Sequence, residues 1–243
     1  MTYLLLFAGP GVAICVYFFY RDIYNKEPRL NLLISFILGA IAIFPAMFFE
    51  RNLGGLVIDG SVNGVAIFAY FVIALSEEGS KFAGFRLFSY RQKSFDEPFD
   101  GIIYAVMVSM GFATAENIKY LIESDPGHEL KTGIQRMITA VPAHATFAIV
   151  MGYFAGKAKF DLKNKFGLLF GGLACAVLLH GTYDFFILLR YYSFVGMIES
   201  NYYLTYGAIV SLVISIILCR KLVRRQRNLS KETFKPTNTT TRV

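Results

Sequence analysis

The chain has 243 residues, of which 55% are hydrophobic and only 17% are charged, and its formal net charge is +7. A soluble domain carries about 25% charged residues, whereas the apolar residues here gather in runs of about 20, the length that crosses a ~30 Å hydrocarbon core. These properties exclude a soluble globular domain. The basic residues lie between the apolar runs and at the C-terminus, which indicates membrane topology and no nucleic-acid partner.

Seven apolar runs predict seven transmembrane helices. In chain order they cover residues 3–20, 30–49, 62–85, 99–122, 133–156, 166–192 and 202–219. In lipid every backbone polar group needs a partner within the protein, which a helix provides, and the sequence lacks the alternating ten-residue strands of a β-barrel. The sequence therefore predicts an all-α, polytopic transmembrane helical bundle over residues 1–222 and a basic, polar, disordered tail over 223–243.

The distribution of Lys and Arg predicts the orientation of the bundle. The odd-numbered connections and the tail are basic, with four Lys between 157 and 165, whereas the second connection holds only Arg51. The positive-inside rule then places the N-terminus outside and the C-terminus in the cytoplasm. Cys15, Cys175 and Cys219 all lie in apolar runs, so no disulfide framework is expected.

Four consecutive predicted helices carry ionisable or strongly polar side chains inside apolar runs. These residues are Glu77, Glu78 and Lys81 in S-E-E-G-S-K, Glu116 and Asn117 in A-T-A-E-N, His144 in P-A-H-A-T, and His180 and Asp184 in L-H-G-T-Y-D. An ionisable group in the membrane costs about 2.5–3.5 kcal/mol on insertion scales and indicates function by default. Glu77 and Lys81 share a helix face, as do His180 and Asp184. Small residues nearby let the helices approach closely, so we expect one interior cavity.

Carboxylates and imidazoles in such a cavity can activate water in two ways. Glu116, His144 and His180 would make three zinc ligands with an open fourth position, with Glu77 or Glu78 as the base. Without a metal, a glutamate takes the proton of water and the histidines stabilise the oxyanion. We favour Glu78 as the base, because Glu77 has the better spacing to pair with Lys81. The same groups could instead relay protons or bind a cation in a transporter.

Four motifs on successive helices, together with the segment R-D-I-Y-N-K-E-P at 21–28, carry a family resemblance. They are E-E-x-x-K from Glu77 to Lys81, F-x-x-x-E-N from Phe112 to Asn117, His144, and H-x-x-x-D from His180 to Asp184. The chain resembles the PrsW family of bacterial intramembrane proteases, which belongs with the superfamily of CAAX-prenyl proteases and bacteriocin-processing enzymes. In the related CAAX-processing enzymes the second motif ends in His where this chain has Glu116, so their mechanism does not carry over directly.

The resemblance implies a multi-pass hydrolase of the bacterial cell membrane. It would cleave a single-pass, membrane-anchored protein such as an anti-sigma factor, by a glutamic or a metal-dependent mechanism. Phe112, Lys81, Asn117 and Asp184 would support the catalytic residues. A transporter and a silent relative that sequesters a membrane partner remain the alternatives. The absence of an internal repeat, a common feature of transporters, favours the enzyme. The sequence leaves the oligomeric state open.

The predicted boundaries pose one problem for a shared site. Glu77 lies toward the cytoplasmic end of its helix and Glu116 toward the outer end of the next one. At 1.5 Å per residue, the two carboxylates could differ in depth by roughly 10–15 Å. A shared site therefore requires a shifted, tilted or broken helix.

Overall fold

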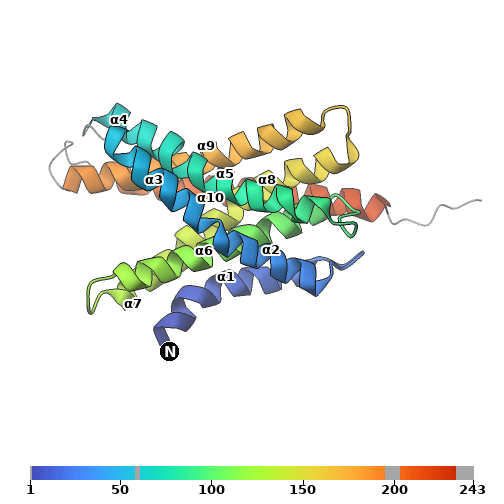
Figure 1. The fold of residues 1–243 in the computed structure, drawn as a ribbon, viewed down its shortest axis with the longest axis horizontal. Helices are drawn as coiled ribbons and strands as arrows, with labels where there is room; N and C mark the ends of the chain where they lie inside the picture. Colours follow the sequence, from blue (N-terminus) through green and yellow to red (C-terminus); the bar gives the residue numbers. More distant parts are fainter. Residues whose placement is uncertain (1, 58–60, 195–202, 234–243) are drawn as a thin grey trace, which may run out of the picture.

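The computed structural model describes residues 2–57, 61–194 and 203–233. All regular elements in these ranges are helical (Figure 1). They are α1 (Thr2–Arg21), α2 (Arg29–Ile41), α3 (Ile43–Val57), α4 (Val62–Ile67), the π-helix η1 (Phe68–Ala74), α5 (Leu75–Leu87), the 3-10 helix η2 (Ser89–Arg91), α6 (Asp100–Glu123), α7 (Glu129–Ile138), α8 (Ala140–Phe160), α9 (Lys165–Phe194) and α10 (Tyr203–Thr233).

Six helical segments of the described chain are long and apolar enough to cross a membrane. They are Arg29–Gly54, Val62–Arg91, Asp100–Glu123, Glu129–Phe160, Lys165–Tyr192 and Tyr206–Thr233. A shorter apolar helix, Leu5–Arg21, precedes them. The all-α, polytopic bundle predicted from the sequence is confirmed, with its first helix shorter than the rest, while the orientation of the termini stays a prediction.

Two of the predicted helices are interrupted, each at a proline. α2 ends at Ile41, four residues before Pro45, and α7 ends at Ile138, four residues before Pro142. The ring of a proline collides with the carbonyl four residues earlier and lacks the N–H that would bond it. The two breaks therefore follow directly from the sequence, although the predicted ranges 30–49 and 133–156 ran through them.

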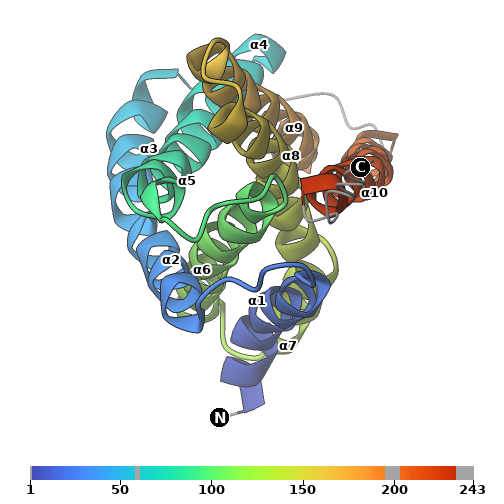
Figure 2. The ribbon, with the colours of Figure 1, turned by 90° about the vertical axis from the view of Figure 1, so that its right-hand side faces the viewer.

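α6 forms the centre of the bundle and is buried along most of its length. Figure 2, which looks onto one end of the molecule, shows α6 enclosed by α1, α2, α5 and α8. Gly101 of α6 lies against the backbone at Gly152 and Gly156 of α8, and Gly111 lies against the backbone of α2. Small residues at these crossings allow the close helix packing that stabilises membrane bundles.

The last helix extends further than the sequence predicted. α10 continues to Thr233, past the expected end at 219 and into the tail expected to be disordered. Its final turns are anchored, because the Gln226 side chain donates to the Pro98 carbonyl at 2.8 Å and the Ser230 hydroxyl accepts from the Phe99 N–H at 3.0 Å. The predicted helix start at 202 and residues 234–243 lie outside the described residues.

Candidate active site

The two adjacent glutamates follow an irregular helical segment. η1 is a π-helix, and α5 continues from it directly, with Glu77 and Glu78 in its first turn. Such segments are rare, occur mostly as single-turn insertions within α-helices, and are frequent at functional sites. Tyr70 of η1 fixes the segment to α9, because its hydroxyl lies 2.8 Å from the Thr182 hydroxyl. The irregular turn therefore joins α9 close to His180.

Lys81 binds both glutamates. Its Nζ donates to Glu77 Oε2 at 3.2 Å and to Glu78 Oε1 at 2.7 Å, and all three side chains are buried. A buried ion pair is retained only when its charges are paired and hydrogen-bonded. The ammonium also lies 4.2 Å from the centre of the Phe112 ring, an attractive cation–π arrangement.

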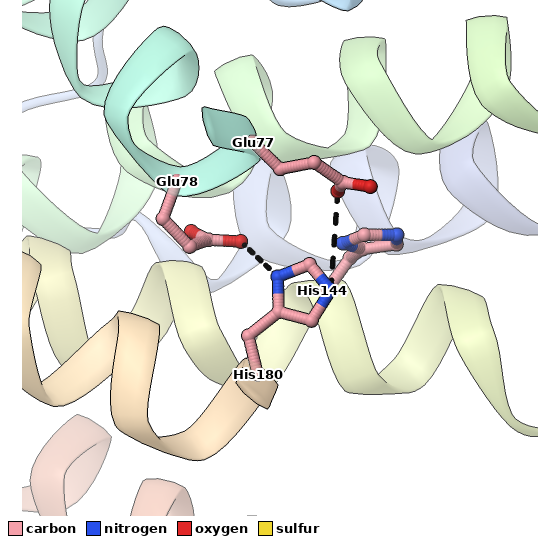
Figure 3. Close-up of side chains that lie close together, drawn as sticks. All are labelled: Glu77, Glu78, His144 and His180. Carbon is pink, nitrogen blue, oxygen red and sulfur yellow. Dashed lines mark hydrogen bonds and ion pairs between the residues drawn. The ribbon is translucent and has the colours of Figure 1, made fainter. Parts of the chain in front are cut away.

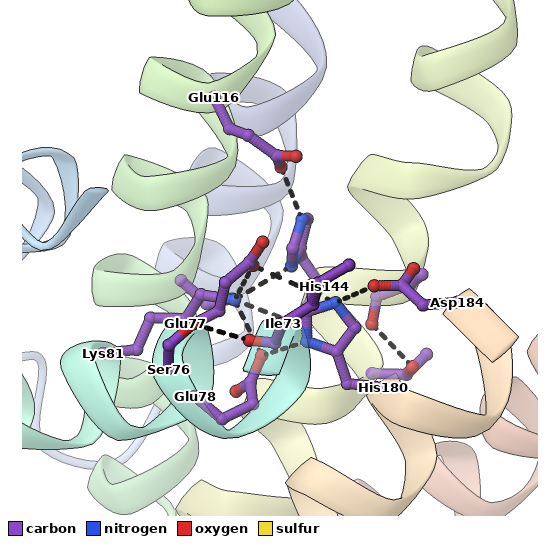
Figure 4. Close-up of polar contacts among 12 residues, drawn as sticks. Ile73, Ser76, Glu77, Glu78, Lys81, Glu116, His144, His180 and Asp184 are labelled. Atoms are coloured by element: carbon purple, nitrogen blue, oxygen red, sulfur yellow. Dashed lines mark hydrogen bonds and ion pairs between the residues drawn. The ribbon is translucent and has the colours of Figure 1, made fainter. Parts of the chain in front are cut away.

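His144 connects this group to Glu116. Its Nδ1 lies 3.1 Å from Lys81 Nζ, and its Nε2 lies 2.8 Å from Glu116 Oε2 (Figure 4). A carboxylate only accepts hydrogen bonds and an ammonium only donates. The proton of the neutral His144 ring is therefore on Nε2, and Nδ1 accepts from Lys81.

His180 lies between carboxylates on both sides. Its Nδ1 is 2.9 Å from Glu78 Oε1, and its Nε2 is 3.1 Å from Asp184 and 3.9 Å from Glu77. Since both neighbours only accept, the fully hydrogen-bonded ring carries a proton on each nitrogen. Figure 3 shows Glu77, Glu78, His144 and His180 converging from α5, α8 and α9.

These side chains border a cavity of about 360 Å³. Five of the residues singled out in the sequence for their charge or imidazole line it, namely Glu77, Glu116, His144, His180 and Asp184. Glu78 and Lys81 lie behind this lining, in a tightly packed region against α6 and α8. Glu77 is therefore the member of the glutamate pair that faces the cavity.

Asn117 does not face the cavity with its neighbour Glu116. Its Nδ2 donates to the carbonyl of Phe7 at 2.8 Å, and its Oδ1 accepts from Arg136 Nε at 2.6 Å. Arg136 in turn contacts Glu116 at 2.8 Å. Asn117 thus orients the arginine that holds Glu116 in place.

Two residues of the site are not among those singled out in the sequence. Arg136 lies near the start of the predicted helix 133–156, and it lines the cavity and pairs with Glu116. Glu50 of α3 also lines the cavity, where its carboxylate accepts from Ser76 at 3.4 Å. The sequence held a signal for Arg136, because Pro142 predicts a helix break shortly after it. Arg136 therefore lies in the last turn of α7, next to the start of α8.

The predicted difference in depth between Glu77 and Glu116 is bridged by side chains. Glu77, Lys81, His144 and Glu116 are linked in that order by contacts of 3.2, 3.1 and 2.8 Å (Figure 4). Glu116 thus reaches the glutamate pair through a lysine and a histidine. The side chains of Lys81 and His144 therefore bridge the difference in depth between Glu77 and Glu116 along the membrane normal.

The donor atoms that could hold a metal differ from the predicted set of Glu116, His144 and His180. Glu77, Glu78, His144 and His180 offer ligand atoms that all lie within 4.8 Å of one another. Glu116 is outside this group, because its carboxylate is held by Arg136 and by the far nitrogen of His144. In this arrangement Glu116 orients a ligand, a common role for a carboxylate next to a metal-binding histidine.

The donor set fits a divalent metal. Imidazole nitrogen and carboxylate oxygen are regular zinc ligands, and Glu78 Oε2 is buried with no hydrogen-bond partner among the residues that the structure describes. The ammonium of Lys81 touches three of the four residues, which shows that the group attracts a cation. Metal binding requires neutral imidazoles. The site then holds four carboxylates and two cations, which leaves a net charge of −2 to attract a metal ion; the carboxylates are those of Glu77, Glu78, Glu116 and Asp184, and the cations are Lys81 and Arg136.

A family model described as "PrsW family intramembrane metalloprotease" matches residues 27–224. The chain is 39% identical to "Protease PrsW" of Geobacillus kaustophilus over 188 residues, which cover 76% of this chain and 80% of that protein. It is 38% identical to "Protease PrsW" of Bacillus subtilis over 181 residues, 74% of this chain and 79% of the relative. With "Protease PrsW" of Clostridioides difficile it shares 31% identity over 220 residues, 88% and 87% of the two chains. No solved structure matches the chain.

Proposed function

The chain belongs to the PrsW family of intramembrane proteases, and we propose that it hydrolyses peptide bonds of a single-pass, membrane-anchored protein with water activated at Glu77. The observation that carries the proposal is the buried contact chain from Glu77 through Lys81 and His144 to Glu116, which borders a cavity within the apolar helices. An anti-sigma factor in the membrane of a bacterial cell is the substrate type we expect. The family match does not favour a transporter.

Glu77 is the proposed general base. A base must reach the water whose proton it takes, and Glu77 lines the cavity whereas Glu78 is fully enclosed. Glu78 Oε1 is already bonded to Lys81 and His180. This assignment is the reverse of the preference that helix spacing gave, because Lys81 contacts both glutamates and is closer to Glu78.

The two histidines have different roles in the proposed reaction. As Glu77 takes a proton, the oxygen of water bonds to the carbonyl carbon and the carbonyl oxygen gains negative charge. His180 is protonated on both nitrogens between Glu78 and Asp184. Its Nε2–H exchanges the Asp184 carboxylate for that oxygen and so stabilises the tetrahedral intermediate. The proton held by Glu77 then passes to the leaving nitrogen as the carbon–nitrogen bond breaks. His144 keeps Lys81 in position beside Glu77.

Zinc offers a second form of the proposal, because the matching family is described as metalloproteases and the donor set fits. In that form Glu77, Glu78, His144 and His180 would hold the ion with neutral imidazoles, in place of the Lys81 ammonium, and Glu77 would be a ligand instead of the base. Glu116 and Asp184 would orient the two rings. A bound zinc would lower the pKa of water to about 7 and polarise the scissile carbonyl.

The proposal is tested with purified protein in liposomes that also contain a labelled single-pass substrate. We expect cleavage by the wild type, and a loss of at least about 100-fold in rate for Glu77→Gln, the size of a general-base contribution. Glu123→Gln is the matched control, because Glu123 is exposed at the end of α6. Unimpaired cleavage by Glu77→Gln would remove Glu77 from the mechanism. Loss of cleavage on chelation, restored by zinc, would assign the reaction to the metal-dependent type.

A further inference from the structure

A second group of acidic residues lies at the opposite end of α6 from Glu116. Asp22, Glu97 and Asp100 offer carboxylate oxygens that all lie within 4.8 Å of one another, and each side chain is fully buried. Asp22 belongs to the connection between α1 and α2, and Glu97 to the connection before α6, whose first residue is Asp100. Figure 2 looks onto the end of the bundle where these two connections lie.

The backbone orients two of these carboxylates. Asp22 Oδ2 accepts from the N–H of Glu27 at 2.9 Å. Asp100 Oδ2 accepts from the N–H groups of Asp96 and Glu97 at 3.0 and 2.8 Å. The other oxygen of each, Asp22 Oδ1 and Asp100 Oδ1, is buried with no hydrogen-bond partner among the described residues.

Two glutamates add further unpartnered oxygens. Within the described part of the chain, Glu97 has no hydrogen bond of ordinary geometry at either carboxylate oxygen, although its side chain is fully buried. Glu27 receives the hydroxyl of Tyr104 on Oε2 and has no partner on Oε1 within the same ranges. Buried polar atoms are nearly always hydrogen-bonded in folded proteins, so five unpartnered carboxylate oxygens in one place indicate a missing positive ligand.

The neighbouring basic side chains do not supply that charge. No ion pair joins Asp22, Glu27, Glu97 or Asp100 to a Lys or Arg within the described ranges. Lys159 donates to the carbonyl of Tyr90 at 2.8 Å instead. Burial, together with the charges of Asp22 and Asp96, raises the pKa of Glu97 to about 7, against a smaller lowering effect of the Ser230 hydroxyl. The group is thus costly to ionise without a cation.

We propose that Asp22, Glu97 and Asp100, with Glu27 beside them, bind a hard divalent cation, Mg²⁺ or Ca²⁺. Both ions take oxygen ligands, and Ca²⁺ does so at 2.3–2.6 Å. Ligands on opposite sides of such an ion are therefore about 4.6–5.2 Å apart, which the spacing of these carboxylates satisfies. The absence of nitrogen and sulfur donors disfavours zinc.

The ion at this position would join segments that are distant in sequence. It lies about 24 Å along α6 from Glu116, since 16 residues separate Asp100 from Glu116 at 1.5 Å each. It would link the two connections to the start of α6, next to the hydrogen bond from Phe99 to Ser230 of α10. Its role is to stabilise this end of the bundle, and it does not depend on the proposed protease chemistry.

The test measures the thermal unfolding midpoint of the full chain in detergent. The protein is first stripped with a chelator and then titrated with MgCl₂ or CaCl₂, with NaCl at equal ionic strength as the reference. We expect a saturable rise of about 5 °C or more at a concentration of about 100 times the dissociation constant. The ion that acts at the lower concentration is the one the site selects.

The variant Glu97→Gln distinguishes two roles for Glu97, a ligand of a bound cation and a buried acid that only supports the structure. Because the variant removes an uncompensated buried charge, its midpoint without cations should equal or exceed that of the wild type, while its cation-dependent rise should be lost. Glu123→Gln and Glu77→Gln should keep the rise, which excludes the surface and the active site as its source. No rise with either cation in the wild type, or the same rise in Glu97→Gln, would overturn the proposal.

Discussion

Arg136 and Glu116 show how a side chain outside the glutamate pair controls the site. Arg136 contacts Glu116 at 2.8 Å, is itself oriented by Asn117, and covers the ring of Tyr120 at 3.9 Å. Glu116 then fixes the His144 ring. Arg136 is therefore a positioning residue, because it acts on the reaction only through Glu116 and His144.

Replacing Arg136 should lower turnover without unfolding the protein. We expect Arg136→Gln to reduce kcat by about 10- to 100-fold, the usual cost of losing a partner of a metal-binding or catalytic group, with KM changed much less. Measurements of both constants in liposomes check this, with the exposed Arg51→Gln as the matched control. A change confined to KM would mean that Arg136 contacts the substrate instead.

Residue spacing predicted the contacts within a helix but not those between helices. Glu77 with Lys81 and His180 with Asp184 were expected from their four-residue spacing, and both pairs are in contact, at 3.2 and 3.1 Å. The contact between Glu116 and His144 joins two helices, so no spacing in the sequence encodes it. The same holds for the choice between the two glutamates, which depends on which one α6 and α8 cover.

Among the secondary-structure elements, the two helix breaks are predictable from prolines, whereas no feature of the sequence predicts the π-helix. Pro45 and Pro142 account for the ends of α2 and α7, as their chemistry requires. The run that forms η1, F-A-Y-F-V-I-A, is an ordinary apolar segment in the sequence. Nothing in this run marks the wider helical turn, and its contact with α9 through Tyr70 and Thr182 is visible only in the folded bundle.

The crossing of α6 and α8 depends on the absence of side chains. A Cβ on Gly152 would overlap the backbone of Gly101, whereas a Cβ on Gly171 in α9 would meet no atom within 4 Å. We expect Gly152→Ala to lower the free energy of unfolding by about 1–3 kcal/mol, the usual effect of overpacking. Gly171→Ala should leave it unchanged or raise it slightly, since alanine is the better helix former. Unfolding midpoints in detergent compare the two, and equal midpoints would contradict the packing argument.

At the scale of the whole molecule, the orientation in the membrane stays a prediction. The connections expected to be cytoplasmic and the C-terminal end of α10 lie at one end of the bundle (Figure 1). α1 has 20 residues, which span about 30 Å at 1.5 Å each, although its apolar part, Leu5–Arg21, is shorter than the six candidate spans. If α1 crosses the membrane as a seventh span, the termini are expected on opposite sides.

Reporters fused to the two termini measure this arrangement. We expect a reporter after Val243 to be active in the cytoplasm and one at Met1 to be active outside, because the basic connections stay inside. Two reporters on the same side would show that α1 does not cross the membrane. A reporter after Val243 that reads as external would reverse the orientation.

The central claim is that Glu77, which faces the cavity, activates water while Glu78 holds His180 and Lys81 beneath it. The most direct measurement compares single-turnover cleavage of the same labelled substrate by Glu77→Gln and Glu78→Gln in liposomes. A glutamine at 78 can still accept from His180 Nδ1 and Lys81 Nζ, whereas a glutamine at 77 cannot take a proton. We predict that Glu77→Gln is at least about 100-fold slower than Glu78→Gln, in line with the loss of a general base. An inactive Glu78→Gln beside a fully active Glu77→Gln would contradict the account.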